Sequence, residues 1–126
     1  MEKGEAVNEN SPIDWSIARQ TVQGDEELLR ELVSTFLGEI PSTMQAMRTA
    51  IDAGEATSLQ RAAHTLKGAL GHFGARRAYD AALTVETLAR GGDVAAAAEG
   101  LPELNLAMAE LTPILVDYVG RSGEKG

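Results

Sequence analysis

Residues 58–74 read SLQRAAHTLKGALGHFG, and this stretch decides the fold because it predicts a helix with two distinct faces. Apolar residues recur in it at steps of three and four, the spacing by which a helix packs into a core. The apolar stripe consists of Leu59, Ala62, Ala63, Leu66, Leu70 and Phe73. His64 lies two residues before Leu66, or about 200° around the helix from that stripe. One face should therefore be buried, and the other should see water.

The face expected to see water carries His64, Lys67, Gly68 and Gly71. A glycine inside a helix costs about 1 kcal/mol relative to alanine, although this chain uses alanine freely elsewhere. Glycines one and two turns beyond His64 leave bare backbone beside the imidazole. We interpret Gly68 and Gly71 as clearance for something large that approaches His64, against the alternative of close packing between helices.

The surroundings of His64 are basic. A neutral imidazole has a lone pair on one ring nitrogen, which makes it a nucleophile as well as a base. Lys67 stands one turn further along the helix, where its charge attracts an anion. Residues 56–79 carry four cationic side chains and no carboxylate, whereas the whole chain has a net charge of -8. A basic patch poor in side chains around one histidine suits a phosphoryl group that a protein delivers.

The motif at residues 64–74, HTLKGALGHFG, closely resembles the H-x-x-K-G-x-x-G-x-x-G signature of histidine-containing phosphotransfer (HPt) domains. These domains are the intermediates of multistep two-component phosphorelays. The segments IDW at residues 13–15 and GDEELL at residues 24–29 also look like the usual lead-in of the family. The resemblance covers roughly residues 12–119.

The resemblance implies that His64 is the phosphoacceptor and that the ring nitrogen pointing outward takes the phosphoryl group. The other ring nitrogen keeps its proton and needs an acceptor that orients the ring. Two residues qualify as that acceptor: Gln60, one turn earlier on the same face, and Glu86 on the next helix, where similar domains often carry a carboxylate. Lys67 is then the cation beside the phosphate.

The same resemblance implies a docking surface for a partner protein around His64. Its expected members are Gly68, Gly71, Gln60, Arg61 and His72. His72 departs from the family, in which a small polar residue is common, and it lies about 80° around the helix from His64. We therefore expect His72 to border the docking surface without accepting phosphate.

The chain as a whole predicts an all-α fold, an antiparallel up-down-up-down four-helix bundle with a short extra N-terminal helix. Short connections between long amphipathic helices force neighbouring helices to run antiparallel. Pro41 falls inside the first long helix and should kink it near residues 38–41. Pro102 either bends the last helical region or starts a separate helix. After a short helix capped by Ser11 or Asp14, the main helices are expected at about residues 26–53, 55 or 57 to 72, 75–90 and from Asp93 onward.

A chain of 126 residues predicts one domain, which we place at residues 11–119. Residues 1–10 are polar and show no periodicity, so they are predicted to be a disordered lead or the end of a linker. Residues 120–126, GRSGEKG, are predicted to form a disordered tail. Gly54 and Gly74 are expected to end helices in a left-handed conformation.

Composition excludes several classes of protein. The chain has no cysteine, which rules out disulfides, thiolate nucleophiles and cysteine-ligated metals. No run approaches the 18 apolar residues of a membrane span, and the first ten residues lack the features of a signal peptide, so we expect a cytoplasmic protein without a membrane partner. A pI near 4.7 argues against nucleic acid as the main partner. We expect a monomer without a cofactor or a metal.

The leading functional hypothesis is a phosphocarrier without autonomous kinase activity, in which His64 accepts a phosphoryl group from a receiver-domain aspartate and passes it to another. The partners would be receiver domains of response regulators or hybrid histidine kinases. Two alternatives remain: the phosphoacceptor domain of a chemotaxis-type histidine kinase, and a helical adaptor that docks on a receiver without carrying phosphate. A di-metal enzyme is disfavoured because Arg61 and Ala69 stand where glutamates would have to precede the two histidines by three residues.

Overall fold

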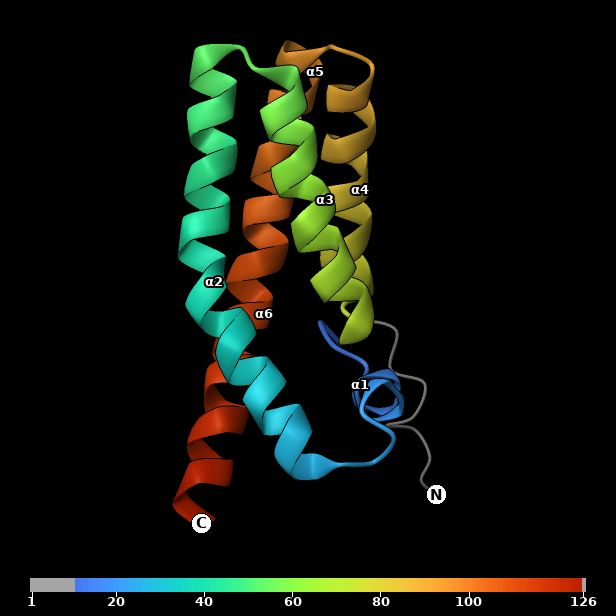
Figure 1. Cartoon of the computed structure of the whole chain (residues 1–126), viewed down its shortest axis with the longest axis vertical. Helices are drawn as coiled ribbons and strands as arrows, with labels where there is room; N and C mark the ends of the chain where they lie inside the picture. The colour runs from blue at the N-terminus through green and yellow to red at the C-terminus, as the bar shows by residue number, and fades with distance from the viewer. Residues whose placement is uncertain (1–10, 126) are drawn as a thin grey trace.

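The computed structural model describes residues 11–125, which form six α-helices and, within that range, no strand (Figure 1). Four long helices run antiparallel as a bundle: α2 ascends in Figure 1, α3 descends, α4 ascends and α6 descends. The short helix α1 lies at the lower end of the bundle, and α5 lies at the upper end. The helices are α1 Trp15–Thr21, α2 Glu26–Ala53, α3 Ala56–His72, α4 Arg76–Arg90, α5 Val94–Glu99 and α6 Leu101–Lys125. The predicted fold class, an all-α four-helix bundle with a short extra N-terminal helix, is confirmed.

Side-chain caps set where several helices begin. Asp14 accepts a hydrogen bond from a backbone N–H at the start of α1, and Asp25 and Asp93 do the same for α2 and α5. Such caps satisfy backbone donors that have no partner inside the helix. At the other end of α2, Gly54 adopts φ +69°, the left-handed conformation expected there. Aspartates and a glycine visible in the sequence therefore determine these boundaries.

Pro41 and Pro102 affect the helices differently. α2 continues through Pro41 without interruption, and Figure 1 shows the helix changing direction along its length. Pro102 lies in the first turn of α6, directly after Gly100 caps α5, so it starts a separate helix. α6 then stays helical through Lys125, whereas the composition of residues 120–126 predicted a disordered tail. The predicted N-terminal lead, residues 1–10, lies outside the described residues, as does residue 126.

The core between the four long helices consists mostly of aliphatic side chains, methionines and alanines, with the rings of Phe36 and Phe73 in contact at a centroid distance of 5.3 Å. Each fully buried leucine contributes roughly 1.5–3 kcal/mol relative to an exposed one. Leu32 on α2 is exposed and does not join the core, although it lies next to the buried Val33. Seven leucines are almost completely buried: Leu29, Leu59, Leu66, Leu70, Leu104, Leu111 and Leu115. Three of them belong to α3, so the apolar stripe predicted for residues 58–74 fixes which side of α3 faces outward.

Helix α1 is fastened to the end of α3. The Asp14 backbone N–H donates to the Gly74 carbonyl at 3.0 Å, and the Thr21 hydroxyl donates to the His72 carbonyl at 2.7 Å. Gly74 adopts φ +65°, which confirms the predicted left-handed stop. A Cβ atom on Gly74 would lie 2.8 Å from the Asp14 Cβ atom, so the absence of a side chain is what lets α1 approach this closely.

Candidate functional site

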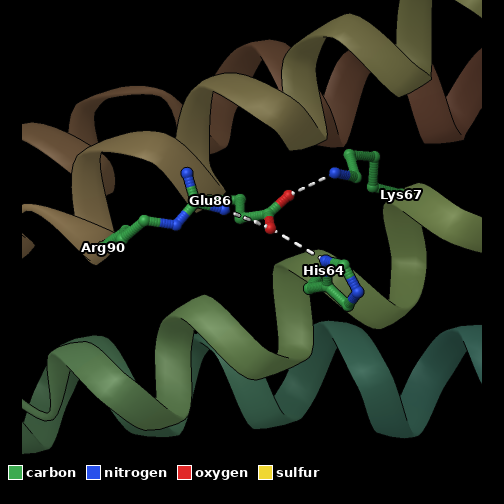
Figure 2. Close-up of polar contacts among 4 residues, drawn as sticks. All are labelled: His64, Lys67, Glu86 and Arg90. Carbon is green, nitrogen blue, oxygen red and sulfur yellow. Dashed lines mark hydrogen bonds and ion pairs between the residues drawn. The ribbon is translucent and has the colours of Figure 1, made fainter.

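His64 stands on the outer face of α3 and reaches toward α4 (Figure 2). Its side chain is 66% exposed, as the position opposite the buried leucines of α3 requires. The ring nitrogen Nδ1 lies 2.8 Å from Oε2 of Glu86, which projects from the middle of α4. Glu86 is only 1% exposed, and it is the one charged residue among the buried residues that the structure describes. An exposed histidine is thus held by a buried carboxylate from the neighbouring helix.

Two further cations contact the Glu86 carboxylate. The Lys67 ammonium lies 2.9 Å from Oε1, and the Arg90 guanidinium donates to Oε2 at 2.7 Å (Figure 2). Within the described residues, the Lys67 ammonium is the polar partner of the buried Oε1 atom, which accepts from no backbone or other side-chain donor. The Lys67 side chain is 18% exposed, which differs from the solvent-facing position predicted for it. Attraction to Glu86 has drawn this lysine against α4.

The charge state of Glu86 determines the tautomer of His64. Burial raises the pKa of the Glu86 carboxyl, but the contacts with Lys67 and His64 outweigh burial and hold the pKa below its usual range. Glu86 is therefore ionised at neutral pH and can only accept hydrogen bonds. The proton of a neutral His64 ring must then sit on Nδ1, which leaves the lone pair on Nε2. Figure 2 shows Nε2 on the side of the ring away from Glu86.

The two glycines beyond His64 have different surroundings. A Cβ atom on Gly68 would meet nothing within 4 Å, so this glycine faces open space. A Cβ atom on Gly71 would lie 3.3 Å from the ring of Tyr79 on α4. Gly68 thus provides clearance at the surface, whereas Gly71 also lets α3 and α4 pack closely, which was the alternative explanation for these glycines.

The remaining residues proposed from the sequence lie on the same helix as His64, and among the described residues none of them forms a hydrogen bond or an ion pair with it. Arg61 and His72 are exposed on α3, and Gln60 is partly buried. Within the described residues, no polar contact joins Gln60 to His64, whereas Glu86 makes a short one. Of the two acceptors left open by the sequence, the structure brings Glu86 to the ring.

Arg90 is the site residue that the sequence interpretation missed. It follows Glu86 by four residues on α4, the spacing at which a glutamate and an arginine meet on one face of a helix. That spacing was visible in the sequence, but it is common on exposed helices and marks no site by itself. Only the burial of Glu86 beneath His64 gives the pair a role.

The described part of the chain has neither a membrane-spanning helix nor a cluster of metal-binding side chains. Residues 11–125 contain no helix with both the length and the apolar character needed to cross a lipid bilayer. The same part of the chain brings together no group of three or more histidine, aspartate or glutamate side chains that could hold a metal ion. The polar cluster of His64, Lys67, Glu86 and Arg90 is the candidate functional site.

The chain is similar to known proteins in sequence and in fold. A family model described as "Hpt domain" matches residues 31–112, which include the whole cluster. The fold is similar to a crystal structure of histidine-containing phosphotransfer protein B from Pseudomonas aeruginosa PAO1, with a TM-score of 0.81, 20% identity, and coverage of 89% of this chain and 97% of that one. It is also similar to the HPT domain of a sensor hybrid histidine kinase from Shewanella, with a TM-score of 0.67, 19% identity, and coverage of 84% and 95%. No curated protein sequence matches the chain.

Proposed function

The chain belongs to the Hpt domain family, and on that premise we propose that it carries a phosphoryl group on His64 between two receiver domains. One receiver would supply the group from its phosphorylated aspartate, and the aspartate of another would take it. The observation that supports this proposal most directly is the 2.8 Å contact between Nδ1 and the buried carboxylate of Glu86, which leaves Nε2 free and facing outward.

The proposed reaction needs little from the bundle beyond this arrangement. The Nε2 lone pair attacks the phosphorus of the aspartyl phosphate, a P–N bond forms, and the P–O bond to the aspartate breaks so that a carboxylate leaves. The ring gains positive charge as long as Nδ1 keeps its proton. Glu86 then stabilises this charge through the hydrogen bond it already makes, and the stabilisation grows during the reaction. The metal that such phosphoryl transfers use would come with the receiver.

The neighbouring residues receive roles in the same proposal. Lys67, one turn beyond His64, attracts the incoming phosphoryl group by its charge while its ammonium rests on Glu86. Gly68 and Gly71 leave room for the receiver, and Gln60, Arg61 and His72 contact it around the histidine. This assignment is supported by the exposed positions of Gly68, Gly71, Arg61 and His72 on α3 and by the partly exposed position of Gln60.

The test is to mix the chain with a phosphorylated receiver and magnesium and then to follow the label. The label should move to this chain as an acid-labile, alkali-stable phosphoramidate and should move on to a second, unphosphorylated receiver. Docking without any transfer of label would support the adaptor alternative. Labelling that requires a kinase domain and ATP, and that no receiver can reproduce, would support the chemotaxis-type alternative.

Glu86→Gln is expected to slow phosphorylation of His64 by about 10- to 100-fold, the usual loss when the partner that orients a functional histidine is removed. Glutamine preserves the volume but cannot balance the charge of the phosphorylated ring. The ¹⁵N NMR signals of the imidazole should show the Nδ1–H tautomer in the wild type and a loss of that preference in Glu86→Gln. Gln60→Ala tests the other acceptor and should leave the tautomer unchanged. The reverse pattern would make Gln60 the orienting residue.

Gly68→Ala is expected to stabilise the chain and yet to impair transfer. The change adds about 0.5–1 kcal/mol to the free energy of unfolding because alanine favours the helix, and nothing within 4 Å opposes the new methyl group. Against a docked receiver the methyl group should cost enough to slow transfer about tenfold. Gly38→Ala is the matched control, since Gly38 is also helical and open but lies on α2. Equal transfer rates in both variants would show that Gly68 provides no clearance.

A further inference from the structure

Arg90 and His64 share one oxygen atom of the Glu86 carboxylate, Oε2. Oε2 of Glu86 lies 2.7 Å from Nη2 of Arg90 and 2.8 Å from Nδ1 of His64, while Lys67 occupies the side of Oε1 (Figure 2). Within the described residues these are the charged and titratable groups that contact the carboxylate. They come from α3 and α4, and among the described residues no hydrogen bond or ion pair joins a side chain of α2, the other long helix packed against α3, to Glu86 or His64. One negative charge therefore faces two permanent positive charges before the histidine is counted.

This surplus of positive charge opposes a further one on the imidazole. Phosphorylation of Nε2 places positive charge on the ring, and the carboxylate of Glu86 is the group that stabilises this charge. Arg90 already donates a hydrogen bond to Oε2. The carboxylate therefore stabilises a positively charged ring less than it would if Arg90 were absent. Arg90 is 53% exposed, so water moderates its effect without removing it.

We propose that Arg90 is a positioning residue that sets the balance of phosphoryl transfer at His64: by sharing Oε2 it limits how strongly Glu86 stabilises the phosphorylated ring, which keeps that ring ready to give up its phosphoryl group. The inference rests on the proposed function and extends it. The phosphohistidine of a carrier must not be too stable, since the phosphoryl group has to be transferred to the next aspartate. Arg90 serves that requirement by limiting how strongly Glu86 stabilises the loaded ring.

The experiment measures where the phosphoryl group resides at equilibrium. The chain is mixed with a phosphorylated receiver, and the ratio of phosphohistidine to phosphoaspartate is determined for the wild type, Arg90→Gln and Arg90→Lys. Arg90→Gln should shift the ratio about threefold toward phosphohistidine, the size expected for one half-exposed charge. Arg90→Lys keeps the charge and should stay close to the wild type. A merely structural role for Arg90 would lower both rates without favouring phosphohistidine.

A second readout removes the receiver altogether. Phosphoramidate is a small donor whose P–N bond breaks as Nε2 attacks, and ammonia leaves. With this donor, Arg90→Gln should be labelled about threefold faster than the wild type, because Glu86 then stabilises the charge that develops on the ring more strongly. Arg121→Gln is the matched control, since Arg121 also pairs with a carboxylate four residues away on a helix but lies on α6, away from His64.

The outcomes separate the two proposals. If neither donor labels wild-type His64, the proposed function fails. If both donors label the wild type and Arg90→Gln matches it in equilibrium ratio and in labelling rate, only the role of Arg90 is overturned. Circular dichroism establishes that each variant is folded, and Arg90→Met, which keeps most of the apolar stem, replaces Arg90→Gln if the latter unfolds.

Discussion

His64→Gln is expected to abolish phosphorylation of the chain by a receiver. The glutamine amide nitrogen has no lone pair available for attack on phosphorus, and Lys67 and Arg90, the other described side chains that pair with Glu86, are cations without one. The fold should be retained, because the histidine is 66% exposed and contributes little to the core. Transfer of radiolabel from a phosphorylated receiver, followed by denaturing electrophoresis at alkaline pH, measures the effect.

His72→Gln is the matched control for that experiment. The same substitution is made on the same helix, at an exposed histidine whose side chain has no contact with Glu86 among the described residues. Labelling of His72→Gln should continue to the wild-type extent, with any change confined to the rate of docking. Label that persists in His64→Gln and disappears in His72→Gln would reassign the phosphoacceptor to His72.

Gly74→Ala is expected to lower the free energy of unfolding by about 3 kcal/mol, a large part of the stability of a domain of this size. Two costs add. Alanine is unfavourable by roughly 1–2 kcal/mol at φ +65°, and its Cβ atom would lie 2.8 Å from the Asp14 Cβ atom and 2.9 Å from the Asp14 carbonyl oxygen, a clash worth a further 1–3 kcal/mol or so. Urea denaturation followed by circular dichroism measures the sum.

Gly54→Ala separates these two costs. Gly54 also adopts a left-handed conformation, at φ +69°, but a Cβ atom there would meet nothing within 4 Å. It should therefore lose only the conformational term, about 1 kcal/mol. The difference between the two variants then reports the close approach of α1 to the end of α3. Equal losses in both would show that α1 shifts away from Gly74 without cost.

Much of the fold could be predicted from the sequence because local rules determine it. The steps of three and four in residues 58–74 predicted which side of α3 is buried, and the structure confirms it with Leu59, Leu66 and Leu70. The N-caps Asp25 and Asp93 were visible because an aspartate before an apolar-periodic segment can satisfy free backbone donors. Such features depend on neighbours within one turn.

The site could be predicted only in part, since its geometry depends on contacts between helices. The sequence named both Gln60 and Glu86 as acceptors for the histidine, and helical periodicity offers no way to measure a distance from α3 to α4. Lys67 was predicted to face water, but its long flexible stem allows it to turn toward a buried charge. A carboxylate that is buried among alanines on α4 looks like any solvated glutamate until the packing is known.

The ends of the chain show a different limit. The composition of residues 120–126 is typical of disorder, yet α6 stays helical through Lys125. Helix propensity is a weak prior that the preceding turns can override, because extending an existing helix needs no new nucleus. Pro41 is a similar case. It removes one hydrogen bond inside α2, but the turns on either side keep the helix continuous.

The division of the cluster between two helices limits what can be transplanted. The motif at residues 64–74 lies wholly on α3 and the turn after it, whereas the counter-charge of its histidine, Glu86, comes from α4. A synthetic peptide or a grafted segment with the motif alone would present an imidazole free to rotate and to choose either tautomer. Under the proposed function, a graft would have to include both α3 and α4 at their native spacing, because His64 and Glu86 act together and the sequence motif contains only the histidine.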